Sequence, residues 1–448
     1  MCDHYHPQSC NTPRIREGVA GFTRRRFLGH SLGLISAATT VPAFLMRAGD
    51  ALAADTTMRL SSKPGVPDDR VLVIVQLSGG NDGINTVIPF GQDAYYEARP
   101  SLAIKAADVL RIPTLDGNPA TDGVGLHPAL GPIREMMDAG LAGVMQGVGY
   151  PNPNRSHFSS MDIWHTGQTE ENNSHGWLGR AIDKLPEPSG LEAISIGNEA
   201  PLALLGEKQR PVSFENAQLF RWAGRDIDKP LEQAYDQMHA ADPQLSTHPD
   251  GDPLAFINRT ALDAEVASSR VRKAVNQKTK TDWKTSGNNL AQQLLNVAKM
   301  ISAELPTRIY YVTLGGFDTH ANQLNSHQRL MSQFASAMKG FYDELEATGH
   351  RSRVVSMAFS EFGRRVRQNA SAGTDHGCAG PTFVFGDAVK PGLLGQYPSL
   401  TQLDKGDLVH TVDFRSLYTD LLDGWMKLDA AAALRGKYPS AGLLRPTA

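Results

Sequence analysis

The stretch VLVIVQLSGGNDG, residues 71–83, decides the fold. Its first seven residues are almost all apolar and mostly β-branched, which is typical of a strand buried on both faces within a parallel sheet. The two glycines end the strand, so Asp82 falls at its carboxyl end, where open α/β sheets bind their ligands. From the residues alone, Asp82 is either a metal ligand or a turn or cap residue. The double glycine is not a P-loop, because no Gly-Lys-Ser/Thr follows it.

Strand and helix patterns alternate along the rest of the chain. Residues 128–139 predict a helix with apolar side chains on one face, and this helix leads into an apolar run at 141–148. Further strands are predicted at 193–196, 309–314, 354–359 and 382–385, and further helices at 328–347 and 415–426. This alternation is typical of βαβ units and predicts an α/β fold with a mostly parallel sheet.

The stretch from about residue 213 to 305 differs from its surroundings. It is charged, mostly helical in pattern and poor in strand patterns, which predicts a helical insertion between strands of one domain covering residues 54–448. Five apolar residues within it recur at helical spacing and predict a stripe that faces the core. These residues are Leu290, Leu294, Val297, Ile301 and Leu305.

The composition is that of an ordinary globular protein. The 448 residues include 44 Lys and Arg against 47 Asp and Glu, and 41% are hydrophobic. These values exclude a disordered chain, a collagen or a small disulfide scaffold. The net charge of −3, without a basic stripe, gives no reason to expect nucleic-acid binding.

The first 53 residues predict a twin-arginine export signal. Residues 23–28 read TRRRFL, a weakly apolar run follows, and Ala51-Leu52-Ala53 has the form of a cleavage site. The run at 28–46 is too polar for a stable membrane span. We therefore expect a periplasmic or secreted protein exported by the twin-arginine translocase. Cleavage leaves Cys378 as the single cysteine, so no intramolecular disulfide is expected.

A block of polar residues at 154–162 is the first candidate for chemistry. It reads NRSHFSSMD and opens a predicted helix. Ser156 is therefore either the N-cap of that helix or a nucleophile whose alkoxide a metal and the helix N-terminus would stabilise. No G-x-S-x-G motif is present, which disfavours an ordinary triad esterase.

Acidic and imidazole side chains recur at the ends of later strands. Asp318 and His320 lie in GGFDTH, Asp375 and His376 lie in TDHG, and His410 lies in HTVD before a helix. Any one of these histidines alone is more often structural than a ligand, but their joint position at strand ends favours a site. Mixed Asp and His ligation without a thiolate suits Zn²⁺, Mn²⁺ or Mg²⁺. Two such ions about 3.5–4 Å apart can assist ester displacement.

Taken together, these motifs resemble an exported bacterial family, that of domain of unknown function 1501. The resemblance rests on the export signal and on LSGGNDG at 77–83, RSHFSSMDIW at 155–164, GGFDTH at 315–320, SEFGRRV at 360–366 and GTDHG at 373–377. It covers essentially the whole mature chain in the right order. The family is grouped with the alkaline phosphatase superfamily, which implies a mostly parallel central sheet between helical layers.

The resemblance also implies a set of site residues. It implies Ser156 as the nucleophile, with Ser159 and Ser160 competing for that role. In a hydrolase we expect substrate contacts from Arg155, His157 and Asn81. The implied metal ligands are Asp82, Asp318, His320, Asp375, His376 and His410. The superfamily's phosphatases usually show Asp-x-x-x-His where this chain has Asp-x-His. His320 is therefore a ligand, a substrate-binding residue or a residue that supports a ligand.

Two functions follow as expectations. The first is an exported hydrolase of small anionic phosphate or sulfate esters that uses one or two divalent ions. The second is a non-catalytic envelope binding or assembly protein that keeps the fold. The frequent occurrence of family members beside a second exported family favours this alternative, with a companion exported protein as its partner. A metal-free esterase is a third, weaker alternative.

Overall fold

The computed structural model describes residues 69–112, 123–169, 173–185, 191–197, 199–209, 211–216 and 267–446. The predicted export signal and residues 217–266 of the predicted insertion lie outside these ranges. None of the helices in the described ranges is long and apolar enough to cross a membrane.

Among the described residues, nine strands form one central sheet in the order β11-β5-β10-β9-β1-β8-β6-β7, with β14 paired to β5. Every pair in it is parallel except those that β10 makes with β9 and β5. The prediction of an α/β fold with a mostly parallel sheet is therefore confirmed. The strands are β1 (Val71–Ser78), β5 (Ala142–Gly149), β6 (Ala193–Ile196), β7 (Val212–Phe214), β8 (Ile309–Gly315), β9 (Val354–Phe359), β10 (Gly380–Phe385), β11 (Gly392–Leu394) and β14 (Val412–Asp413).

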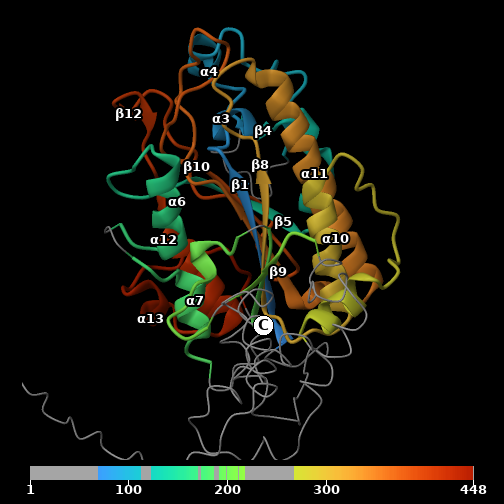
Figure 1. Ribbon diagram of the computed structural model, residues 1–448. Helices are drawn as coiled ribbons and strands as arrows, with labels where there is room; N and C mark the ends of the chain where they lie inside the picture. The colour runs from blue at the N-terminus through green and yellow to red at the C-terminus, as the bar shows by residue number, and fades with distance from the viewer. Residues whose placement is uncertain are drawn as a thin grey trace, which may run out of the picture.

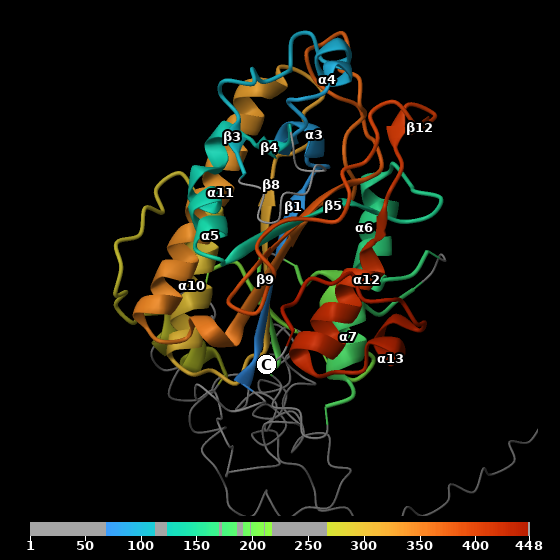
Figure 2. The same ribbon diagram turned by 180° about the vertical axis from the view of Figure 1, so that it is seen from behind.

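Helices cover both faces of this sheet, and Figures 1 and 2 show the resulting three layers from opposite sides. One layer contains α5 (Gly131–Asp138), α10 (Asn289–Ser302) and α11 (Gln323–Ala347). The other contains α6 (His157–Thr166), α7 (Trp177–Ile182), α12 (Phe414–Thr419), the π-helical segment Asp420–Met426 that follows it, and α13 (Ala430–Leu434). The implied arrangement of a sheet between helical layers is thus present.

Short elements lie beyond the carboxyl ends of the central strands. They are α3 (Gly83–Thr86), α4 (Asp93–Ala98), a small sheet of β2 (Val87–Ile88), β3 (Leu110–Arg111) and β4 (Gly125–Leu126), and the hairpin β12 (Leu403–Asp404) and β13 (Asp407–Leu408). Figure 1 shows α3, α4, β4 and β12 at the upper end of the molecule, toward which β8 points.

Strand β1 divides the interior into two cores. Val71, Val73 and Val75 pack into the core under α10 and α11, whereas Leu72 and Ile74 pack into the core under α6, α7 and α12. Alternate residues of a strand point to opposite faces. Because both faces of β1 are covered, its sequence is continuously apolar and does not alternate with polar residues.

The predicted helices differ from the observed ones mainly at their starts. Helix α11 begins at Gln323, five residues before the predicted start. The prediction missed this first turn because the turn is mostly polar and shows no hydrophobic periodicity. The predicted apolar stripe of α10 is buried as expected, with Leu290, Leu294 and Val297 fully inaccessible to solvent.

A buried polar cluster lies under α6 and predicts a pH dependence. The Nε2 atom of His165 lies 3.0 Å from the Tyr311 hydroxyl and 3.3 Å from the Gln76 side-chain oxygen. Burial lowers the pKa of His165 to about 4 from its ordinary value of 6.5. The unfolded chain therefore takes up this proton first as the pH falls, so folding stability decreases from pH 6.5 toward pH 4.

We expect His165→Gln to reduce this loss of stability by about 2–3 kcal/mol. Urea unfolding of both proteins between pH 7 and pH 4 measures the effect. Other buried histidines titrate equally in both, so the difference isolates His165. Equal pH slopes for the two proteins would contradict the prediction.

Candidate metal centre

Four side chains from three separate segments meet at the carboxyl ends of the central strands. Asp318 and His320 lie in the loop between β8 and α11, His376 lies in the loop before β10, and His157 begins helix α6. Strands β1, β8 and β9 are mutually parallel, so their carboxyl ends share one edge of the sheet. This edge is where open α/β sheets place their ligands.

The three imidazoles converge on one carboxylate oxygen. Oδ1 of Asp318 lies 2.9 Å from Nε2 of His320, 3.0 Å from Nε2 of His376 and 3.3 Å from Nε2 of His157. The ligand atoms of His157, Asp318 and His376 all lie within 4.8 Å of one another, close enough to share one ion. The four side chains are between 23% and 48% exposed, so the centre is open to solvent.

The second ring nitrogen of each imidazole faces an acceptor. Nδ1 of His157 lies 2.8 Å from Oε1 of Glu361, and Nδ1 of His376 lies 2.8 Å from the carbonyl oxygen of Arg155. Nδ1 of His320 lies 3.5 Å from Oδ1 of Asp375. Carbonyl and carboxylate oxygens only accept, so these contacts place a proton on Nδ1, and a ring that carries its single proton there has its lone pair on Nε2.

Nε2 of His320 also lies 2.9 Å from Nε2 of His376, so imidazole nitrogens and a carboxylate oxygen are gathered at one point, as in a metal site. Nε2 of His157 is buried and has no hydrogen-bond partner among the described residues. Histidine ligands of metals commonly donate their other N–H to a carboxylate or a carbonyl, as these three do. The donor set therefore fits a divalent cation, and imidazole together with carboxylate suits Zn²⁺ or Mn²⁺.

Arg364 holds together the loops that carry the centre. Its guanidinium is completely buried and donates to the carbonyl oxygens of Gly79, Gly80, Phe317 and Thr374. It also donates to Oδ1 of Asp318 at 2.7 Å. Burial raises the pKa of Asp318, but the hydrogen bond and the charge of Arg364 oppose burial, and the pKa lies below its usual range.

The double glycine has a packing role at this edge. Gly79 has φ +120°, and a Cβ there would lie 2.5 Å from the backbone nitrogen of Asp318, so only glycine lets that loop approach. The amides of Gly79 and Asn81 donate to the Glu361 carboxylate and to Oγ of Ser360, each at 2.9 Å. Those amides are consequently not free to bind a phosphate group.

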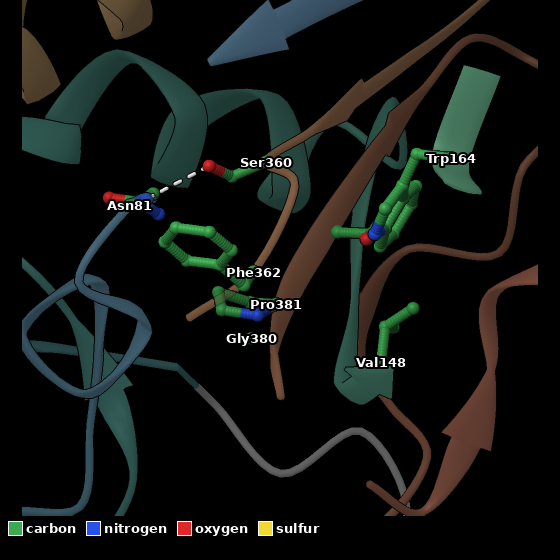
Figure 3. A pocket seen from close by; sticks show the side chains of 8 residues that line it. Asn81, Val148, Trp164, Ser360, Phe362, Gly380 and Pro381 are labelled. Carbon is green, nitrogen blue, oxygen red and sulfur yellow. Dashed lines mark hydrogen bonds between the residues drawn. The ribbon is translucent and has the colours of Figure 1, made fainter. Parts of the chain in front are cut away.

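Asn81 lies beside a small cavity and not in the cluster of imidazoles. Figure 3 shows Asn81, Ser360 and Phe362 on one side of this cavity, with Trp164 of α6 across it. The Asn81 side-chain oxygen accepts from His327 at 3.0 Å.

Asp82 occupies a different place from the predicted one. It is fully buried and pairs with Arg99 at 2.5 Å, and it also accepts from Gln323 and from the amide of Asn85 as cap of α3. Burial raises the pKa of Asp82, but the Arg99 charge outweighs burial and lowers it. Asp82 thus lies apart from the group of His157, Asp318 and His376, and its carboxylate is paired with the Arg99 charge.

Two other predicted ligands also lie outside the cluster. His410 is half-buried and has no hydrogen bond or ion pair to any described residue. The Asp375 carboxylate contacts Nδ1 of His320. It also accepts a hydrogen bond from the Asn369 side chain, and this bond lowers the pKa of Asp375. Asp375 thus lies beside His320, and among the described residues one group of three side chains, His157, Asp318 and His376, could hold an ion.

The residues around Ser156 also take new positions. His157, predicted to contact substrate, belongs to the ligand cluster. Arg155 pairs with the buried Asp407 and contributes only its carbonyl oxygen to the centre. Ser156 is exposed at the N-cap of α6 and does not cap the helix with its side chain, whereas Ser160 is buried and bonded to Tyr150 and to the carbonyl oxygen of Glu361.

Sequence reasoning did not assign roles to Glu361 and Arg364, although both lie in the quoted SEFGRRV motif. An acidic residue and an arginine directly after a buried strand were the available signal. Their partners are far away in the chain, for example Gly79 and His157, so no local pattern connects them.

The fold and the site define an α/β protein with a candidate metal centre at the carboxyl edge of its sheet. The family model described as "Protein of unknown function (DUF1501)" matches residues 128–432. The chain belongs to this family, as the motifs indicated. A search of curated proteins gave no match.

Solved structures with a similar fold include members of the alkaline phosphatase superfamily. One such protein from Vibrio parahaemolyticus is 9% identical with a TM-score of 0.37, and the match covers 88% of this chain and 76% of that one. Alkaline phosphatase from the Antarctic bacterium TAB5 is 10% identical with a TM-score of 0.30, covering 72% and 94%. A phosphonate monoester hydrolase from Silicibacter pomeroyi is 10% identical with a TM-score of 0.30, covering 83% and 76%. Likeness this weak carries no argument about activity.

Proposed function

We propose that the protein is an exported, metal-dependent hydrolase of small phosphate or sulfate esters. The observation that carries the proposal is the convergence of three imidazole Nε2 atoms on the Asp318 carboxylate at a solvent-open edge of the sheet. A divalent cation held by His157, His320, His376 and Asp318 would act as a Lewis acid toward an anionic ester.

Residues of the chain supply the remaining parts of a hydrolytic site. Ser156 is exposed and immediately precedes the ligand His157, which makes it the candidate nucleophile. It stands at the N-terminus of α6, a ten-residue helix whose free amides favour negative charge. These features support anionic substrates over neutral ones.

One observation favours the alternative of a non-catalytic envelope binding protein. The Arg364 guanidinium is fully buried among carbonyl oxygens and Asp318, and Arg155 is paired with Asp407. Neither arginine is therefore available to hold the transferred anionic group. In this alternative the metal centre would serve a structural or binding role.

The proposal also covers the location and partners of the protein. The twin-arginine pattern at 23–28 supports export by the twin-arginine translocase to the periplasm or medium. That route carries folded proteins, which suits a chain that acquires its metal before export. A companion exported protein is the partner we propose for the non-catalytic alternative.

Metal analysis of the purified protein, followed by assays with para-nitrophenyl phosphate and sulfate, tests this function. We expect about one divalent ion per chain and turnover that requires Zn²⁺, Mn²⁺ or Mg²⁺. Ser156→Ala should abolish turnover and keep the metal. Bound metal without any turnover would favour the envelope binding protein, and absence of both metal and turnover would overturn the proposal.

A further inference from the structure

Glu361 is a buried carboxylate that lies directly behind the metal centre. Its side chain is only 1% exposed, and its Oε1 atom accepts from the amide of Gly79 at 2.9 Å and contacts Nδ1 of His157 at 2.8 Å. Oε2 accepts from Oγ of Ser360 at 3.0 Å. Among the described residues, no lysine or arginine forms an ion pair with it.

A buried carboxylate without a cationic partner is costly, because burial removes the water that would solvate its charge. The carboxylate contacts His157 at 2.8 Å, and Nε2 on the other side of that ring is buried and lacks a hydrogen-bond partner among the described residues. The ring therefore lies between a negative charge behind it and the position of a cation in front of it. Carboxylate, histidine and metal commonly form such a chain.

Other contacts of the imidazole agree with this orientation. The ring of His157 lies against those of Phe362 and His376, with centroid separations of 4.9 and 4.4 Å. These neighbours confine the ring but do not select which nitrogen carries the proton. The carboxylate of Glu361 makes that selection, because it accepts only from a protonated Nδ1.

We propose that Glu361 is a positioning residue that fixes His157 with its proton on Nδ1 and its Nε2 lone pair directed at the metal. The metal part of this inference rests on the proposed function. Glu361 also balances the charge of the bound cation through the imidazole, and it does not itself bind the metal.

Binding of Co²⁺, followed by its visible absorption and by competition with a chelator, measures the predicted effect. We expect Glu361→Ala to weaken Co²⁺ binding by about 10–100-fold, and Glu361→Gln to lie between this variant and the wild type. Glutamine keeps an oxygen that can accept from Gly79 and His157 but lacks the charge. Glu344→Ala is the matched control, since Glu344 is equally buried but bonds only to residues 280–283.

A double-mutant cycle separates positioning from a general structural role. If Glu361 acts through His157, the variant with both His157→Ala and Glu361→Ala binds Co²⁺ as weakly as His157→Ala alone. Additive losses would show that Glu361 acts independently of His157 and would overturn the proposal. Unchanged Co²⁺ affinity in Glu361→Ala would also overturn it.

Nitrogen NMR of histidine-labelled, metal-free protein tests the same role without any metal. The resonances of His157 are identified by their loss in His157→Ala. We expect a protonated Nδ1 in the wild type and a shift toward protonated Nε2 in Glu361→Ala. A wild-type His157 with its proton on Nε2 would contradict the proposal. If the wild type binds no Co²⁺, the proposed function fails while this experiment still decides the role of Glu361.

Discussion

Replacing His376 by alanine is expected to weaken binding of a divalent metal by more than the roughly 100-fold that the loss of an outer contact can cost. His376 supplies one of the three Nε2 atoms that converge on Asp318, and its Nδ1 atom is held by the carbonyl oxygen of Arg155. Its removal leaves two imidazoles and the Asp318 carboxylate, and that carboxylate is already paired with Arg364. Activity toward aryl phosphates and sulfates should be lost with the metal.

His410→Ala is the matched control for this change. His410 was an equally plausible ligand from the sequence, but it lies outside the cluster. Isothermal titration of metal-free protein with Zn²⁺ should give the same affinity for His410→Ala as for the wild type. A loss of affinity in His410→Ala, with retention in His376→Ala, would show that the metal binds elsewhere.

Replacing Asp82 by alanine is expected to lower the free energy of unfolding by about 3–5 kcal/mol, because it leaves the Arg99 charge buried without its partner. Both side chains of this pair are completely inaccessible to solvent. The folded fraction of Asp82→Ala should still bind metal as the wild type does. Urea unfolding and metal titration of the same preparation measure the two effects separately.

The double variant with Asp82→Ala and Arg99→Met serves as the control, since removal of both charges is far less costly than removal of one. It should recover much of the lost stability. The lowered pKa of Asp82 adds a pH criterion, because its stabilisation is present above the ordinary value of 3.8 and is lost as the pH falls further. Asp82→Ala that keeps its stability but loses metal would identify Asp82 as a ligand.

The layers of the fold were predictable because their signals are local. The continuous apolar run of β1 and the runs that became β8 and β9 indicate buried parallel strands without knowledge of their neighbours. The position of Asp318, His320 and His376 near strand ends was enough to nominate them for a metal site. The start of α11 was less predictable, since its polar first turn carries no periodicity.

The composition of the site was only partly predictable. Asp82 and Asp318 both follow buried strands, and nothing in their local sequence distinguishes a carboxylate that pairs with Arg99 from one that meets three imidazoles. Glu361 is likewise a single acidic residue until its contact with His157, 204 positions away, is known. Such differences depend on which distant segments pack together.

The sequence by itself determined the α/β class, the family and the edge of the sheet at which the candidate site lies, because strand burial and strand ends are properties of short segments. Only the tertiary structure decided that His157 lies beside Asp318 and His376, that Asp82 and His410 lie apart from them, and that Glu361 and Arg364 contact this cluster. The physical reason is that the role of a charged or imidazole side chain is set by its burial and by its nearest opposite charge. In this chain those partners come from segments that are distant in sequence.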